Sequence, residues 1–264
     1  MHHSVLSHLE SPKGTGVGAR VGFAIAGRFD IEAPVGVARP WMEGRTMVLY
    51  RDRIDAGREL GDRLRHLRGL DVVILGLARG GVPVAAEVAK SLSAPLDVVV
   101  VRKLGVPSQP EVAMGAIAEG GARVLDRRLV KEIAISQDAL DRVERRERRA
   151  LDARTLLYRS RRPRTDLHGR VAVVVDDGVA TGATARAACL SVRSAGASTV
   201  ILAVPVGPNG VGQTVTEADE VVCLATPIDF HAVGLYYSNF RPTSDDEVLV
   251  LLDEADERGA RARD

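Results

Sequence analysis

Short apolar runs alternate along the chain with longer segments in which apolar residues recur at helical spacing. Four runs are mostly apolar, and they lie at residues 71–77, 96–101, 171–175 and 199–204. Runs of this length, bounded by glycine, proline or charged residues, are typical of strands that are buried on both faces of a parallel sheet. The sequence therefore predicts a sheet whose strands are separated by helices.

Helical segments are predicted before, between and after these runs. They cover residues 54–67, 83–92, 136–158, 184–195 and a C-terminal segment from 244. Ser136 and Ser244 stand where an N-cap is expected, and Glu247 gives the last helix the spacing of a capping box. The alternation predicts an α/β fold with an open, mainly parallel sheet and helices on both faces. Ligands of such sheets bind at the carboxyl ends of the strands.

Two segments interrupt the alternation. The segment after the second run contains Pro107 and Pro110 and has no period, so we expect an irregular, mobile loop from Arg102 to about Gly115. Residues 119–122, Glu-Gly-Gly-Ala, predict a hairpin turn between two short strands.

The first 46 residues differ from the rest because they are rich in glycine and small residues and show no sustained period. We expect a loosely ordered, dispensable N-terminal extension, followed by one folded domain over 47–264, with Met47 as an alternative start. Residues 14–19 formally fit the dinucleotide-binding fingerprint. However, Ser-Pro-Lys precedes them where a strand is required, so the match is weak.

Composition narrows the class of protein. The net charge of +1 gives no overall field that favours nucleic acid or a membrane surface, and no run of about 18 apolar residues predicts a membrane span. Cys189 and Cys223 have no metal-type spacing, which favours a reduced, cytoplasmic chain with two buried thiols. The charged stretch 142–149 interleaves acids with arginines, which favours a solvated helix face, paired as Asp141–Arg145 and Glu144–Arg148, over a nucleic-acid-binding arm.

The most informative segment is 171–185. Its strand ends in two adjacent carboxylates, Asp176 and Asp177, and a Thr-Gly-Ala-Thr turn then opens a helix. Small residues let backbone N–H groups approach a ligand, and the unpaired donors of a helix start suit a phosphate. The carboxylates can accept hydrogen bonds from vicinal hydroxyls or hold a hydrated Mg²⁺. A ligand with a phosphate at one end and a diol nearby would satisfy both halves.

This order of apolar strand, two acids and Thr-Gly-x-Thr resembles the motif with which type I phosphoribosyltransferases bind 5-phosphoribosyl-1-diphosphate (PRPP). The resemblance implies that Asp176 and Asp177 contact the ribose hydroxyls. It also implies that the turn wraps the 5-phosphate with Ala180, Thr181, Gly182, Ala183 and Thr184. The alternative is an ordinary strand–turn–helix with capping acids, which the specificity of the motif disfavours.

Two earlier loops fit the same family. The Gly-rich turn after the first run resembles the family's pyrophosphate loop, which assigns Arg79 and Gly80 to PRPP binding. Arg102 and Lys103 begin the segment where the family places a mobile catalytic loop. Cations there would offset the charge that develops on the departing diphosphate. Alternatively, the first loop is a plain turn and the second pair is a solvated strand end.

The resemblance covers roughly residues 51–252 and is nearest to a bacterial subgroup of phosphoribosyltransferases whose substrates are not settled. It implies Mg²⁺ as cofactor, held mainly by PRPP, with Asp176 and Asp177 contributing through water. It also implies transfer of the 5-phosphoribosyl group to an unidentified small-molecule acceptor. Three matters stay open: a homodimer, a PRPP-sensing regulator that binds RNA or DNA, and a non-catalytic module paired with a partner enzyme.

One position departs from many purine-salvage members of the family. They carry an acid where this chain has Ala180, so no side chain there can act as a general base. Glu111, in the expected mobile loop, is the replacement we consider, because adenine-type members use a loop glutamate similarly. A surface or helix-capping acid is the equally weighted alternative.

Aromatic residues are scarce, yet several gather near the C-terminus. The segment 226–243 is predicted to form the small hood that roofs the acceptor pocket in this fold. Within it Phe230, Tyr236 and Phe240 are the candidates for stacking on a planar acceptor. The alternative, that these rings pack the hood onto the core, is favoured.

Overall fold

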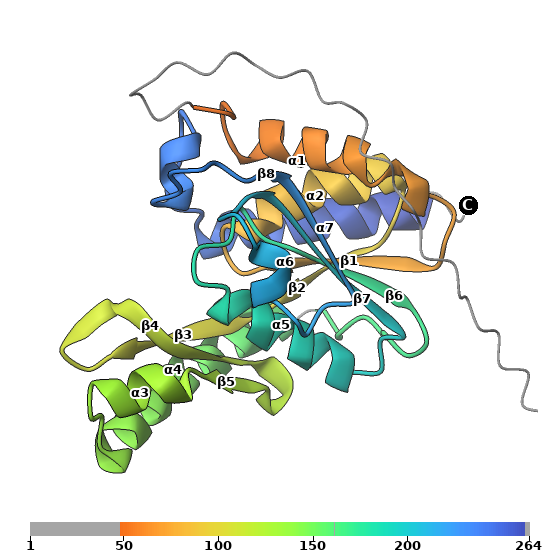
Figure 1. Ribbon diagram of the computed structural model, residues 1–264. Helices are drawn as coiled ribbons and strands as arrows, with labels where there is room; N and C mark the ends of the chain where they lie inside the picture. Colours follow the sequence, from red (N-terminus) through yellow and green to blue (C-terminus); the bar gives the residue numbers. More distant parts are fainter. Residues whose placement is uncertain (1–47, 161, 262–264) are drawn as a thin grey trace, which may run out of the picture. The chain divides into compact units, whose positions relative to one another are not determined.

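The computed structural model describes residues 48–160 and 162–261 (Figure 1). Its main sheet has five parallel strands in the order β2-β1-β6-β7-β8. Their bounds are β1 Val72–Leu77, β2 Leu96–Val99, β6 Val171–Val175, β7 Thr199–Val206 and β8 Glu220–Ala225. All four strands expected from the apolar runs are therefore confirmed. The N-terminal extension and the dinucleotide fingerprint lie outside the described residues.

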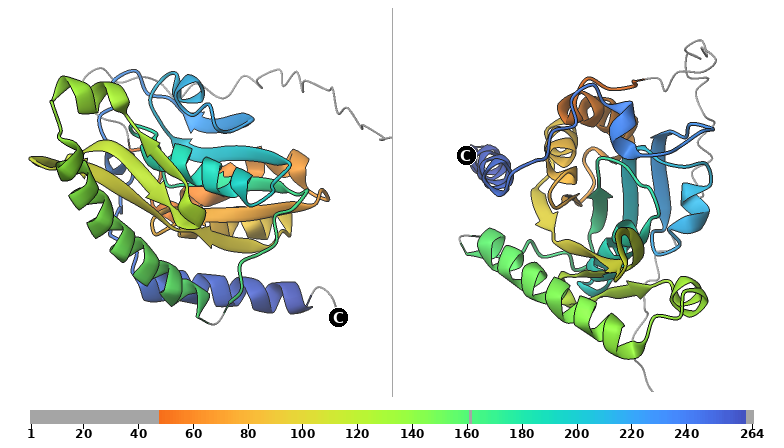
Figure 2. Two further views of the ribbon diagram at one scale, coloured as in Figure 1. Left: turned by 90° about the horizontal axis from the view of Figure 1, so that it is seen from below. Right: turned by 90° about the vertical axis from the view of Figure 1, so that its left-hand side faces the viewer.

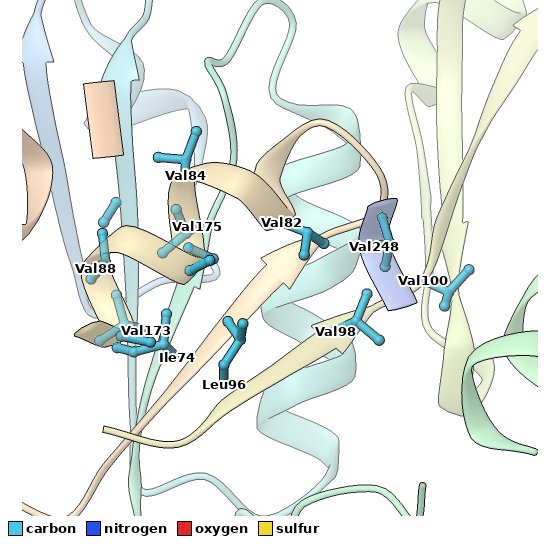
Figure 3. Close-up of a cluster of buried hydrophobic side chains, with 14 of the residues drawn as sticks. Ile74, Val82, Val84, Val88, Leu96, Val98, Val100, Val173, Val175 and Val248 are labelled. Carbon is cyan, nitrogen blue, oxygen red and sulfur yellow. The ribbon is translucent and has the colours of Figure 1, made fainter. Parts of the chain in front are cut away.

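Helices cover both faces of this sheet, as predicted (Figure 2). These helices are α1 Arg53–Arg63, α2 Gly81–Leu92, α5 Ala183–Ser194 and α7 Asp245–Arg261, whereas α4 Gln137–Arg159 packs mainly on a second sheet. Successive residues of β1 point to opposite faces, so Ile74 packs in the cluster with α1, α2 and α7, while Val73 packs in the cluster with α5. Figure 3 shows part of the first cluster, in which Ile74, Val173 and Val248 lie among valines of α2. A single apolar run thus supplies residues to two cores.

A second, antiparallel sheet contains β3 Val101–Val106, β4 Gln109–Ala118 and β5 Arg123–Leu125. The expected irregular loop from Arg102 is therefore wrong, because this segment is a hairpin of β3 and β4. Pro107 lies in its turn, and Pro110 lies where the register between the strands shifts. Neither proline removes a bond from a regular ladder, so both are tolerated. The hairpin predicted around 119–122 is confirmed, with a 3-10 turn at Glu119–Gly121 linking β4 to β5.

The long charged helix α4 begins where it was predicted, and it lies along β3 and β4 of the second sheet (Figure 2). Ser136 Oγ accepts a hydrogen bond from the amide of Ala139, and the expected Glu144–Arg148 pair is present at 3.1 Å. Asp141 instead accepts from Gln137 Nε2 at 2.7 Å. Glu144 and Glu147 thus pair with two arginines of the same helix, Arg148 and Arg146, which agrees with a solvated face.

The N-terminal end of α7 is fixed by two reciprocal hydrogen bonds. The amide of Glu247 donates to Ser244 Oγ at 3.0 Å, and the amide of Ser244 donates to Glu247 Oε2 at 2.9 Å, which confirms the capping box of α7.

The remaining helical segments are short: η1 Arg65–Leu67, α3 Arg127–Glu132, α6 Val211–Thr214 and η3 Val233–Tyr236. Over the described part of the chain, no helix combines the length and apolarity needed to cross a membrane.

The two cysteines differ in burial. Cys189 is fully buried in α5, and burial raises its pKa to about 12. Cys223 is only half-buried in β8, so the expectation of two buried thiols is half right, although burial still raises its pKa to about 11. Both thiols are protonated at neutral pH and are therefore poor nucleophiles.

Candidate active site

Two loops meet at the carboxyl ends of β1 and β6. These strands are neighbours, with Gly76 paired to Val175, so the loops that follow them lie side by side. An ideal Cβ placed on Gly81 would lie 2.4 Å from the carbonyl oxygen of Val175, and one on Gly80 would lie 2.1 Å from Asp177 Oδ2. The glycines therefore permit the close approach of the two loops.

The adjacent acids sit in this junction. Asp176 Oδ1 accepts a hydrogen bond from the amide of Asp177 at 2.9 Å. Burial raises the pKa of Asp176 well above its ordinary value, and the negative charge of Asp177 raises it further. Burial also raises the pKa of Asp177, although Arg53 opposes that shift. A site that holds two partly buried carboxylates side by side is prepared for hydrogen-bond donors or a cation.

The partner of Asp177 is a residue that the sequence did not single out. Arg53, in the first turn of α1, donates from Nε to Asp177 Oδ2 at 2.8 Å, and its Nη2 forms an ion pair with the same oxygen at 2.7 Å. From the other side, the hydroxyl of Tyr237 donates to the backbone oxygen of Asp177 at 2.6 Å. No local sequence signal marks Arg53, because 124 positions separate it from its partner.

The Thr-Gly-Ala-Thr turn opens α5 as expected. Gly182 adopts a left-handed conformation with φ of 78°, and no side chain caps the helix that starts at Ala183. Ala180 and Thr181 are exposed, whereas Thr184 is half-buried in the first turn. The backbone donors at this helix start are thus available to an anion, which suits a phosphate group.

Arg79 is placed beside the site, with its guanidinium directed toward α7. The Ala78–Arg79 peptide bond is cis. Arg79 Nη1 lies 3.8 Å from Asp245 Oδ2, and Arg154 Nε of α4 lies 3.1 Å from Oδ1 of the same acid. Tyr158 also donates to Asp245. Arg79 and Arg154 therefore share the carboxylate of Asp245.

Arg102 and Lys103 point in opposite directions because they are consecutive residues of β3. Arg102 donates to Glu147 Oε2 of α4 from Nε at 3.0 Å and from Nη2 at 2.8 Å. Lys103 Nζ lies 3.0 Å from the backbone oxygen of Glu111 and 3.3 Å from its Oε2, across the hairpin. The two cations that were expected to act together therefore point to different sides of the hairpin, and Arg102 is bound to Glu147 of α4.

The aromatic residues of the hood pack mainly on one another. Tyr236 is only 3% exposed, and its ring stacks on that of Phe230 at a centroid distance of 5.6 Å. The ring of Phe240 lies beneath the guanidinium of Arg53, 4.0 Å from its carbon. Tyr236 therefore offers no open face to an acceptor in this arrangement, while Phe230 and Phe240 are half-buried.

Two features bear on cofactors and ligands. A pocket of about 620 Å³ is lined by residues of β5, α3 and the start of α4, and none of the strand-end residues contributes to it. The two acids and the start of α5 lie together at the strand ends and not in the pocket. Within residues 48–160 and 162–261, no group of three or more metal-ligating side chains could hold an ion on its own.

Comparison with known proteins decides the family. The model of the phosphoribosyl transferase domain matches residues 52–238, which include both strand-end loops and most of the hood. The chain belongs to the phosphoribosyltransferase family. Its order of loops is that of the type I members, as the motif at 171–185 predicted.

Individual relatives agree with this assignment. Two Mycobacterium tuberculosis proteins, provisionally named phosphoribosyl transferases, are 58% identical to this family member over 210 residues, or 79% of the chain and 47% of each relative. The chain thus spans about half the length of the curated relatives it matches. The crystal structure of the protein TT1426 from Thermus thermophilus is 44% identical, with a TM-score of 0.65, and the match covers 78% of this chain and 98% of that one.

Proposed function

We propose that this phosphoribosyltransferase-family protein binds PRPP with Mg²⁺ and transfers the 5-phosphoribosyl group to a small-molecule acceptor. The observation that carries the proposal is the junction of two adjacent, partly buried carboxylates with an uncapped helix start. Asp176 and Asp177 would accept hydrogen bonds from the ribose hydroxyls. The turn from Ala180 to Thr184 would bind the 5-phosphate through its backbone donors and its two threonine hydroxyls.

In the proposed reaction, the bond between C1 of the ribose and the diphosphate oxygen breaks, and its electron pair leaves with the diphosphate. A nucleophilic atom of the acceptor forms the new bond to C1 and loses a proton. The protein must then stabilise negative charge on the leaving group and exclude water. The guanidinium of Arg79 and the ammonium of Lys103 are the cations that we assign to the first task.

Mg²⁺ fits this site only if PRPP and the protein hold it together. Mg²⁺ would neutralise charge on the diphosphate and orient it. Asp176 and Asp177 are the carboxylates that would reach its water ligands, since Mg²⁺ keeps several waters when it is held by few side chains. Because the described residues offer no larger ligand cluster, most of the remaining ligands would come from PRPP itself.

A residue outside the strand-end motif must accept the proton that the acceptor loses. Ala180 is exposed beside the Thr-Gly-Ala-Thr turn and carries no titratable group. The Glu111 side chain is 98% exposed on the hairpin and pairs with Lys103, so it is free to move with the hairpin. We retain Glu111 as the candidate general base and Phe230 as the candidate stacking residue for a nucleobase.

Calorimetry with PRPP tests the proposal directly. Saturable binding is expected in the presence of Mg²⁺ and should weaken when a chelator removes the metal. Release of diphosphate in the presence of a panel of nucleobases, followed by mass spectrometry, would then identify the acceptor. Absence of binding at millimolar PRPP would overturn the proposal, whereas binding without diphosphate release would favour a PRPP sensor.

The β3–β4 hairpin is expected to move when PRPP binds. Its turn region is held to the rest of the protein weakly, since Pro110, Glu111 and Val112 are exposed and the ion pair of Lys103 with Glu111 lies within the hairpin. Amide hydrogen exchange at 103–112 should therefore slow when PRPP and Mg²⁺ are added. The neighbouring strand β5 provides the control, because it should change little.

Two variants separate the roles assigned to this hairpin. Lys103→Ala should lower turnover more than PRPP affinity if Nζ acts on transition-state charge. Glu111→Gln should impair turnover and leave PRPP affinity nearly intact. Equal protection of the hairpin with and without PRPP would contradict the closing motion and remove the case for Glu111.

A further inference from the structure

The guanidinium of Arg53 joins three segments that are distant in sequence. Its Nε and Nη2 bind Asp177 Oδ2 at the end of β6, and its Nη1 donates to the backbone oxygen of Arg241 at 2.8 Å. Its face lies on the ring of Phe240 at 4.0 Å. The Arg53 and Asp177 side chains are only 11% and 14% exposed, so water screens this pair weakly.

Asp177 is thereby held to the hood twice. Arg53 links its carboxylate to Phe240 and Arg241, and Tyr237 donates directly to its backbone oxygen. Figure 1 shows the hood, in blue, beside the N-terminal end of α1, and the isolated bridge between Tyr50 and Tyr237 agrees with this contact. A shift of the hood must therefore be transmitted to the acid that we assign to the ribose.

The hydrogen bond from Arg53 Nε and the ion-pair contact of Nη2 both end on the same carboxylate oxygen, Oδ2. These contacts fix the rotation of the carboxylate, and the guanidinium does not engage its other oxygen, Oδ1. Gly80 closes the other side, because a Cβ there would lie 2.1 Å from Oδ2 and 3.3 Å from Arg53 Nη2. Oδ2 is thus enclosed, and Oδ1 is the oxygen that a ribose hydroxyl would use.

We infer that Arg53 is a positioning residue that orients Asp177 for the ribose and couples the hood, where the acceptor would bind, to the PRPP site. The inference rests on the proposed function. Its consequence is reciprocal: PRPP should order the hood, and an acceptor held by the hood should tighten PRPP binding by the same factor. Arginine suits this role because its planar fork supplies several directed donors and one stacking face, which a lysine ammonium does not.

Hydrogen exchange of the full-length protein tests the coupling, with PRPP and Mg²⁺ as the probe. In the wild type, PRPP should slow exchange both in 177–184 and in the hood segment 233–243. In Arg53→Gln, PRPP at saturation should still protect 177–184 but should no longer protect the hood. PRPP affinity should fall by about tenfold or more, the size expected for loss of charge-assisted hydrogen bonds.

Two further variants control for simple loss of structure. Arg53→Lys keeps the charge and should fold, yet it should lose most of the hood protection because it lacks the fork. Arg58→Gln removes another arginine of α1, whose pair with Glu87 lies outside the site, and should behave as wild type. If Arg53 had a structural role alone, its variants would have a lower melting temperature, but PRPP would slow exchange in the hood and in 177–184 to the same extent.

The free protein supplies a measurement that does not depend on PRPP. Without any ligand, Arg53→Gln should speed exchange of the hood amides relative to both wild type and Arg58→Gln. If hood exchange is unchanged in the free variant, or if PRPP still protects the hood at saturation, the coupling is wrong. If the wild type fails to bind PRPP while the free variant shows faster hood exchange, the proposed function fails and the link between Arg53 and the hood stands.

Discussion

Asp176→Asn is expected to weaken PRPP binding strongly while making the free protein more stable. The carboxylate that we assign to the ribose becomes a neutral amide of the same shape. A charge-assisted hydrogen bond is worth about 1.5–3 kcal/mol, so PRPP affinity should fall by roughly ten- to a hundredfold. Stability should rise because the native chain partly buries this carboxyl beside that of Asp177, and the amide removes one of the two charges.

The pH dependence of this stabilisation follows from the direction of the pKa shift. Burial, and then the charge of Asp177, raise the pKa of Asp176 above its ordinary value of 3.8, so the folded protein binds the proton more tightly than the unfolded chain does. The stability from this group is full below 3.8 and is lost as pH rises through the raised pKa. The amide of the variant does not titrate, so its stability gain should be small in acid and largest at neutral to alkaline pH.

Thermal unfolding of the ligand-free protein, in the presence of a chelator, measures this effect. A gain of about 1 kcal/mol raises the melting temperature of a domain of this size by roughly 2–4 °C. Asp62→Asn is the matched control, since its side chain is 62% exposed and pairs only with Arg65. A melting temperature of Asp176→Asn that is lower than wild type at pH 8, or unchanged PRPP affinity, would contradict the assignment.

The part of the site that the sequence predicted is the part that is contiguous in the chain. A strand, two acids and the turn that opens α5 follow one another within fifteen residues, so local patterning was sufficient to place them. The contact between Arg53 and Asp177 depends on how α1 packs across the end of the sheet. Arg53 stands in a helix with many other charged residues, and only the fold distinguishes it from Arg58.

The hairpin shows why the second group of site residues was harder to predict. Two prolines and the absence of a period led to an expected loop, because the shift of register around Pro110 hides the alternation of β3 and β4. Had β3 been recognised as a strand, its period of two would have placed Arg102 and Lys103 on opposite faces. The binding partner of Arg102, Glu147, lies 45 residues away and has no local signal.

Gly80→Ala is expected to damage the site through a single added methyl group. The backbone of Gly80 has φ of −60° and ψ of −32°, so alanine meets no conformational strain there. However, its Cβ would lie 2.1 Å from Asp177 Oδ2 and 2.9 Å from Asp177 Cγ. The carboxylate cannot turn aside without breaking its bonds to Arg53. Overpacking of this kind costs about 1–3 kcal/mol, and PRPP affinity should fall by at least roughly tenfold.

A double-mutant cycle isolates the collision from other effects of the substitution. Gly212→Ala, where the nearest atom is Val221 Cβ at 3.9 Å, is the control and should leave stability and PRPP affinity almost unchanged. In an Asp177→Ala background the obstructing carboxylate is gone, so Gly80→Ala should then cost little stability. Residues in direct contact are expected to show such non-additivity. If Gly80→Ala lowers the melting temperature equally in both backgrounds, the carboxylate of Asp177 is not what requires a glycine at this position.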